Sequence, residues 1–131
     1  MTEVKCNACY VSPYFGCVVD CSNKDLSMVP DITSKAMYLD LSLNHIQVLR
    51  NYEFSNWKLY GLVHLDLSHN GIEEIEPFAF ENLVNLKVLD LSSNHFIKPL
   101  PRNMLPQSYI MEKLRLANNP TLKPLSDYHL L

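Results

Sequence analysis

The 131-residue sequence has few glycines, little charge and no long apolar run. Its 3 Gly argue against a glycine-rich loop that cradles phosphate. Its formal net charge of −3 lacks the basic excess of a nucleic-acid-binding domain, so no nucleic-acid partner is expected. No apolar run approaches the ~18 residues of a membrane span. Apolar residues nevertheless make up 47% of the chain, which is enough for one folded domain.

Common catalytic motifs are also missing from the sequence. It holds no Gly-x-Ser-x-Gly elbow, no His-Glu-x-x-His motif and no P-loop. Several serines recur at a regular spacing, which is typical of surface positions on a scaffold rather than of an activated nucleophile. We therefore expect a protein that is not an enzyme and that holds no cofactor and no metal ion.

Leucine and asparagine are present in excess, with 21 Leu and 12 Asn. Aligning the asparagines gives four rows of the pattern Leu-x-x-Leu-x-Leu-x-x-Asn, which begin at residues 36, 62, 86 and 111. Ala36 and Met111 replace the first leucine in the two outer rows. One such row cannot bury its own leucines, so the period of 24 to 26 residues predicts a stack of repeats.

Each row predicts a short strand followed by a turn. Leu39 and Leu41 are two residues apart and point to one side of a strand, while Asp40 and Ser42 point to the other. Stacked rows would pair these strands in parallel, with Asn44 and its equivalents bonding the backbone of the turns. Amphipathic helices are the alternative origin of the leucine spacing, but the period of two in Leu-Asp-Leu-Ser favours strands.

A second set of apolar residues predicts the outer side of the coil. Phe54 and Phe80 each lie 18 residues after the start of a row, and other large apolar residues follow at matching positions. The expected apolar plugs are Phe54, Trp57, Phe80, Leu83 and Met104. The prolines within Lys98–Pro101 exclude a helix, so we expect an irregular outer side there.

Four cysteines precede the first row, at Cys6, Cys9, Cys17 and Cys21. Two disulfides would stabilise a loop-rich segment that has little core of its own and covers the first repeat. Three pairings are possible. A zinc site made by all four thiolates and free thiols in a cytosolic protein are the alternatives.

The rows resemble the repeats of extracellular leucine-rich-repeat (LRR) proteins. Leu-Asp-Leu-Ser at residues 39–42, 65–68 and 89–92 resembles most closely the N-terminal part of Toll-like receptor ectodomains, and residues 21–30 resemble the end of a cysteine-rich cap. The resemblance implies an α/β fold: an LRR solenoid, or horseshoe fragment, with a short parallel concave sheet, an irregular convex side and a disulfide-bonded N-terminal cap. It also implies the pairs Cys6–Cys17 and Cys9–Cys21.

The expected organisation is a cap followed by repeats. The cap would span residues 1–34 and the repeats residues 35–131, divided into 36–61, 62–85, 86–110 and a partial 111–131. Residues 1–5 carry no apolar signal sequence, so either a signal was removed or the chain is not secreted, and we expect removal. No cysteine cluster follows Asn119, so we expect a fragment of a longer protein whose last residues, 127–131, begin the next turn's core.

The outward strand positions are the candidate binding site. Parallel stacking would align the outward aspartates into an acidic stripe that ends at Arg115 and meets a basic or amide-rich partner. The alternative is a solvated face without a binding role, on which each aspartate bonds a nearby Ser or Asn. Two histidines beside the stripe could also sense pH. The expected contact residues are Tyr38, Asp40, His64, Asp66, His69, Asp90 and Arg115.

The resemblance implies a non-catalytic recognition module of an extracellular or cell-surface LRR receptor. A protein or microbial ligand would bind the concave face, receptor dimerisation is possible, and the role would be innate immune pattern recognition of the Toll-like kind. An adhesion, guidance or matrix LRR protein and an intracellular LRR adaptor are the alternatives. Fold-level resemblance does not identify the ligand.

Overall fold

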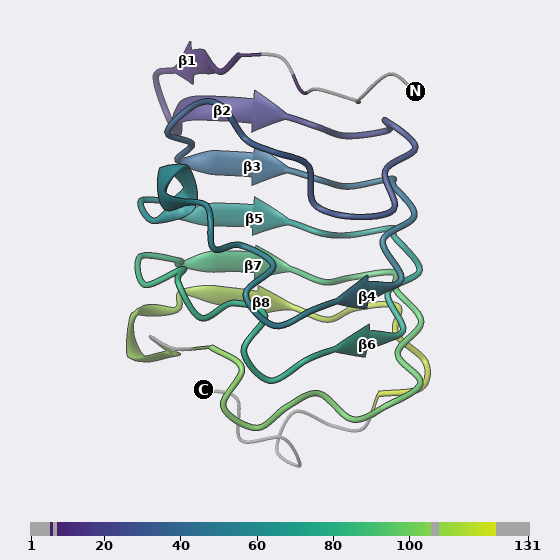
Figure 1. The fold of residues 1–131 in the computed structure, drawn as a ribbon. Coiled ribbons are helices and arrows are strands. Elements are labelled where there is room, and N and C mark those ends of the chain that lie inside the picture. The colour runs from purple at the N-terminus through teal and green to yellow at the C-terminus, as the bar shows by residue number, and fades with distance from the viewer. Residues whose placement is uncertain (1–5, 7, 106–107, 123–131) are drawn as a thin grey trace.

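The computed structural model describes residues 6, 8–105 and 108–122 of the chain. Within these residues the chain winds as a solenoid with one main strand per turn (Figure 1). The large sheet has the order β1-β2-β3-β5-β7-β8, from β1 (Tyr10–Ser12), β2 (Gly16–Asp20), β3 (Tyr38–Asp40), β5 (His64–Asp66), β7 (Val88–Asp90) and β8 (Lys113–Arg115).

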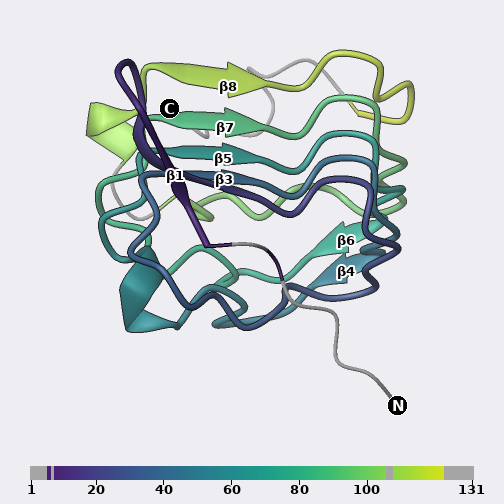
Figure 2. The same ribbon diagram turned by 90° about the horizontal axis from the view of Figure 1, so that it is seen from above.

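Short elements form the other sides of the coil. A second, two-stranded sheet pairs β4 (Val48–Leu49) with β6 (Glu74–Ile75), and Figure 2 shows it on a different side of the coil from the large sheet. Two 3-10 helices, η1 (Trp57–Leu59) and η2 (Ser108–Ile110), lie in the connections. No helix in the described part of the chain is long and apolar enough to cross a membrane.

The register of the large sheet follows the leucines. Leu39 pairs with Leu65, and Leu65 pairs with Leu89, all in parallel strands. These three side chains are fully buried, as are the leucines two residues after each. The predicted parallel sheet and leucine core are therefore confirmed. Since β2 of the cap pairs directly with β3, cap and repeats share one sheet, and the boundary at residue 34 stays a prediction.

The asparagines form the predicted ladder inside the turns. Asn94 is buried, and its Oδ1 accepts hydrogen bonds from the backbone N–H groups of Asn70 and Ile72, both at 3.0 Å. Its Nδ2 donates to the carbonyls of Leu67 in the preceding repeat, at 3.1 Å, and Leu91 in its own, at 2.9 Å. Each asparagine thus satisfies buried backbone groups of two neighbouring turns, which locks their spacing.

The outer side matches four of the five expected plugs. Phe54 and Phe80 stack at 5.7 Å between ring centroids, and Leu83 and Met104 are also buried. The expectation for Trp57 was wrong, because its side chain is 57% exposed.

Leu59 is buried on this stretch of the coil in place of Trp57. Trp57 opens the η1 turn, in which residues two apart point in different directions, so only one of the pair can face the core. Its ring instead lies beside the Nζ atoms of Lys35 and Lys58, at 5.2 and 5.6 Å.

All four cysteines form disulfides, but the expected pairing was wrong. The structure joins Cys6 to Cys21 and Cys9 to Cys17. β1 and β2 form an antiparallel hairpin in which Val11 lies opposite Cys17. A hairpin brings residues together as nested pairs, the inner pair inside the outer one, whereas the implied pairing crosses. The expected role of residues 127–131 falls outside the described residues and stays a prediction.

The ladder predicts a large cost for removing one buried amide. We expect Asn94→Ala to lower the free energy of unfolding by roughly 3 to 5 kcal/mol, because several buried backbone groups lose their partners. Asn85→Ala, at an exposed asparagine that donates one hydrogen bond to the Tyr60 carbonyl, should cost less than about 1 kcal/mol. Urea denaturation of both variants measures the difference. Equal losses would contradict a structural role of the ladder.

The nested pairing predicts which double cysteine variants keep a bridge. Cys9→Ser with Cys17→Ser should retain the outer disulfide and lose about 2 to 3 kcal/mol. Cys6→Ser with Cys17→Ser should break both bridges and leave two free thiols. Intact mass after alkylation without reductant counts the thiols in each. The opposite result, with two free thiols in the Cys9/Cys17 variant and none in the Cys6/Cys17 variant, would support the crossed pairing instead.

Candidate functional site

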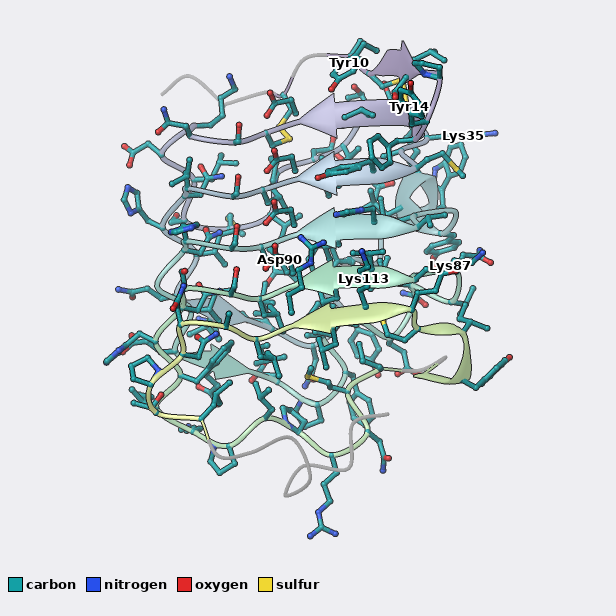
Figure 3. All side chains as sticks on the ribbon, turned by 180° about the vertical axis from the view of Figure 1, so that it is seen from behind. Tyr10, Tyr14, Lys35, Lys87, Asp90 and Lys113 are labelled. Carbon is teal, nitrogen blue, oxygen red and sulfur yellow. A yellow bond between two sulfur atoms is a disulfide. The ribbon has the colours of Figure 1, made fainter. Side chains whose placement is uncertain are left out.

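Two rows of side chains cross the outward face of the large sheet, toward the viewer in Figure 3. The strand register aligns one row of mostly apolar and aromatic residues and a second row of charged residues. The first row is Val18, Tyr38, His64, Val88 and Lys113. The second row is Asp20, Asp40, Asp66, Asp90 and Arg115. Six of the seven predicted contact residues fall in these rows.

The aromatic part of the face is pre-packed. The rings of Tyr38 and His64 stack with centroids 3.9 Å apart and planes 12° from parallel. Phe15 meets both edge-on, at 5.1 Å from Tyr38 and 6.1 Å from His64. Edge-to-face and stacked aromatic pairs contribute more stabilisation than the burial of their surface area alone. The three rings therefore form a rigid cluster on the surface.

Sequence reasoning missed Phe15. It lies in the turn between β1 and β2, and that turn brings it against the rings of the first two repeats. Ser12 stabilises the turn, since its Oγ accepts hydrogen bonds from the N–H groups of Tyr14 and Phe15. The available signal was the aromatic-rich turn in residues 10–16, with a serine, a proline and a glycine between two short apolar stretches.

A groove runs along this cluster. It has a volume of about 410 Å³ and crosses from the cap hairpin over the first three repeats to the start of the fourth. Its walls are mostly apolar, with one carboxylate at the far end. The lining residues are Tyr14, Phe15, Gly16, Met37, Tyr38, Val63, His64, Val88 and Glu112. Apolar and aromatic side chains left exposed beside one another mark a place where a partner can bury them.

The aspartates have a structural contact on one oxygen each. Oδ1 of Asp40 accepts hydrogen bonds from the N–H and Oγ–H of Ser42, at 2.9 and 2.6 Å. Asp66 and Asp90 repeat this contact with the serine two residues on. The alternative, in which each aspartate bonds a nearby serine, therefore holds for the Oδ1 atoms. No hydrogen bond between described residues ends on Oδ2 of Asp40 or Asp66.

The charge row changes sign along the sheet. Arg115 occupies the place of the aspartate in β8, and its Nη1 lies 3.9 Å from Oδ2 of Asp90. Lys113 is exposed on the same strand, and Figure 3 shows Asp90 and Lys113 on this face, away from Tyr10 and Tyr14 at the cap end. The cap end of the face is therefore acidic and aromatic, whereas the β8 end is basic.

His69 lies apart from the rows. It is exposed in the turn that follows β5 and has a φ of 56°, in the left-handed region. Leu43, Ser93 and Asn118 adopt the same conformation at the equivalent places. The N–H of His69 donates to the Ser92 carbonyl at 3.1 Å. The structure thus groups Tyr38, His64 and the charged row, and places His69 beyond the strand ends.

Burial changes the acid–base properties of the two stacked rings. It raises the pKa of Tyr38 to about 12, and the charges of Asp66 and Asp40 add to this effect. Burial also lowers the pKa of His64, although the nearby carboxylates oppose the change. Both rings are therefore neutral at physiological pH. Among the described residues, no His, Cys, Asp or Glu side chains gather as a metal-binding set.

A solenoid with one strand per repeat, leucines inside and an asparagine ladder at each turn defines the LRR class. The family model "Leucine rich repeat" matches residues 34–96 and 60–120, and the chain belongs to this family. LRR proteins generally serve as non-enzymatic protein-binding modules, and stacked repeats of this kind present an extended concave surface.

Several relatives are similar to the chain in sequence. The chain is 38% identical to Leucine-rich repeat-containing protein 3 of Danio rerio over 105 residues, covering 79% of this chain and 38% of the relative. It is 36% identical to human Leucine-rich repeat-containing protein 3B over 114 residues, covering 86% of this chain and 42% of the relative. It is 35% identical to Tsukushi of Gallus gallus, covering 79% of this chain and 28% of the relative.

A solved structure shares the fold as well. The crystal structure of human trophoblast glycoprotein, also titled Wnt-activated inhibitory factor 1, superposes with a TM-score of 0.59 and 34% identity, covering 74% of this chain and 35% of that chain. The chain thus spans about two fifths or less of the length of these relatives. None of those named here is a Toll-like receptor, so that closer resemblance stays a prediction.

The lowered pKa of His64 predicts a pH dependence of stability. As the pH falls, His64 is protonated at a higher pH in the unfolded chain than in the folded chain. The contribution of neutral His64 to the free energy of unfolding is therefore fully present above its ordinary pKa of 6.5. It should be lost as the pH falls toward the lower folded-state pKa. Urea denaturation at about pH 7.5 and about pH 5.5 should show a smaller acid loss for His64→Gln than for the wild type. The same loss in both proteins would contradict this assignment.

Proposed function

We propose that the chain is a non-catalytic recognition module of a secreted or cell-surface LRR protein, which binds a protein or microbial ligand on the outward face of its large sheet. The observation that carries the proposal is the rigid cluster of Phe15, Tyr38 and His64 beside the apolar groove. Pre-ordered aromatic anchors lose little conformational entropy on binding and dominate the energy of many interfaces.

The charged row supports recognition of a specific partner. Carboxylates lie next to the aromatic cluster at the cap end, and cations lie at the β8 end. Such a polarised face orients a complementary partner and raises the rate of productive encounter more than it raises affinity. In this proposal, Tyr38, Asp40, His64, Asp66, Asp90 and Arg115 are the contact residues, with His69 at the edge.

The disulfides support the proposed location. Two bridges join all four cysteines of the cap, and such bridges persist in oxidising compartments rather than in the cytosol. They therefore favour a secreted or surface protein over an intracellular adaptor. Within this class, a Toll-like innate immune receptor is the narrower proposal, supported by the Leu-Asp-Leu-Ser resemblance. An adhesion, guidance or matrix role in another extracellular LRR protein is the alternative.

The proposal predicts that binding depends on this face and not on the outer side. The oxidised protein would be screened against arrays of extracellular domains and microbial surface components. For each binder, we expect Tyr38→Ala to weaken affinity by about tenfold or more, because the ring is a central anchor. Surface plasmon resonance measures the change.

Phe78→Ala is the matched control, because Phe78 is an exposed aromatic residue on the outer side, stacked on Tyr52. It should leave affinity within about twofold of the wild type, and thermal unfolding would verify that both variants fold. Binders that respond to Phe78→Ala and not to Tyr38→Ala would place recognition on the outer side. An absence of any binder to the folded protein would also count against the proposal.

A further inference from the structure

A separate small notch lies where the cap meets the first repeat. It has a volume of about 170 Å³ and opens on the same face as the groove. Its lining combines three aromatic rings, two carboxylates and one buried valine: Tyr10, Phe15, Tyr38, Asp20, Asp40 and Val18. We propose that this notch receives the side chain of an arginine from a protein partner. The inference rests on the proposed function, because it names the chemistry that the face recognises.

The carboxylates present two acceptors side by side. Asp20 and Asp40 are direct register partners on β2 and β3, and neighbouring strands lie about 4.8 Å apart. Ser22 donates two hydrogen bonds to Oδ1 of Asp20, at 2.9 and 2.6 Å, as Ser42 does for Asp40. The carboxylates are thus held in place while each Oδ2 accepts no hydrogen bond from the described residues. A planar guanidinium can bridge two such oxygens with parallel N–H donors.

The aromatic rings provide the complementary surface for a flat cation. Tyr38 is on β3, and its ring stacks on that of His64 on the neighbouring strand β5. The strand on the other side of β3 is β2, which borders the notch. Phe15 and Tyr10 extend this aromatic surface from the cap hairpin. A guanidinium binds aromatic rings by cation–π attraction and by stacking, and it is more weakly hydrated than an ammonium group. The notch therefore suits arginine better than lysine.

Within the chain, one guanidinium already lies beside a carboxylate of this row. At the other end of the row, Arg115 occupies the register position next to Asp90 and lies 3.9 Å from its Oδ2. No ion pair among the described residues involves Asp20 or Asp40. The cap end thus offers the same kind of acceptor, and the charge of Lys24 acts on Asp20 without forming an ion pair with it. The cap end also adds an aromatic wall that the Asp90 end lacks.

Asp20 remains charged under the conditions of binding. Hydrogen bonds from Ser22 lower the pKa of Asp20, and the charge of Lys24 contributes in the same direction. The carboxylate is therefore ionised at neutral pH and stays so in mild acid. Salt should weaken binding, because both Asp20 and the incoming cation are exposed to solvent before they meet.

The test is a titration of the oxidised, isotope-labelled protein with the peptide N-acetyl-Gly-Arg-Gly-amide, followed by amide NMR shifts. We expect saturable shifts confined to residues 15–22 and 38–42. The citrulline peptide has nearly the same shape without the charge and should bind at least tenfold more weakly. The corresponding lysine peptide should bind with an affinity between those of the arginine and citrulline peptides.

Paired variants assign the effect to the notch. Asp20→Asn with Asp40→Asn keeps the Oδ1 acceptors for Ser22 and Ser42 and removes only the charge, and it should weaken arginine-peptide binding at least tenfold. Asp31→Asn makes the same change at an exposed aspartate outside the notch and should bind like the wild type. Unchanged thermal unfolding of each variant separates a lost contact from a lost fold.

Four outcomes would overturn the inference. Equal shifts from the citrulline peptide would show that charge is not recognised, and full binding by the double asparagine variant would exclude the two carboxylates. Concentration-dependent self-association that Arg115→Gln abolishes would make a second copy of the chain the occupant instead. If the arginine peptide fails while a partner still depends on Tyr38, this inference is wrong and the proposed function stands.

Discussion

The buried asparagine amide at each turn is the interaction on which the rest of the structure depends. A turn between a short strand and an irregular connection leaves backbone groups without partners, and in a narrow coil water cannot reach them. Asn70 and Asn94 satisfy these groups in their own turn and in the preceding one. Because each side chain spans two repeats, the repeats stack at one spacing and in one register.

That register creates the outward face. Residues at equivalent places of successive repeats lie side by side, so Tyr38 meets His64, and Asp20, Asp40, Asp66 and Asp90 form one row. The aspartates then serve two purposes. Oδ1 of each accepts hydrogen bonds from the serine two residues on, and this contact positions the carboxylate. Oδ2 of Asp90 lies beside Arg115, whereas Oδ2 of Asp20, Asp40 and Asp66 accepts no hydrogen bond from the described residues and can bind a partner. A structural and a binding role are therefore compatible in the same side chain.

The cap does more than cover the first repeat. Its hairpin is held by the nested Cys6–Cys21 and Cys9–Cys17 bridges, which fix the turn that carries Phe15. Phe15 and Tyr10 complete an aromatic surface that the repeats alone would leave open on one side. Reduction of the cap would therefore be expected to affect recognition as well as stability, because the same bridges support both.

The sequence by itself determined the strands, the leucine core, the asparagine ladder and which residues point outward. These features follow from spacing along the chain, and a short strand obeys a period of two wherever it is placed. The tertiary structure alone decided the nested disulfides, the exposure of Trp57 and the position of Phe15. Each of these depends on how the chain turns back on itself, which residue types and their spacing do not specify.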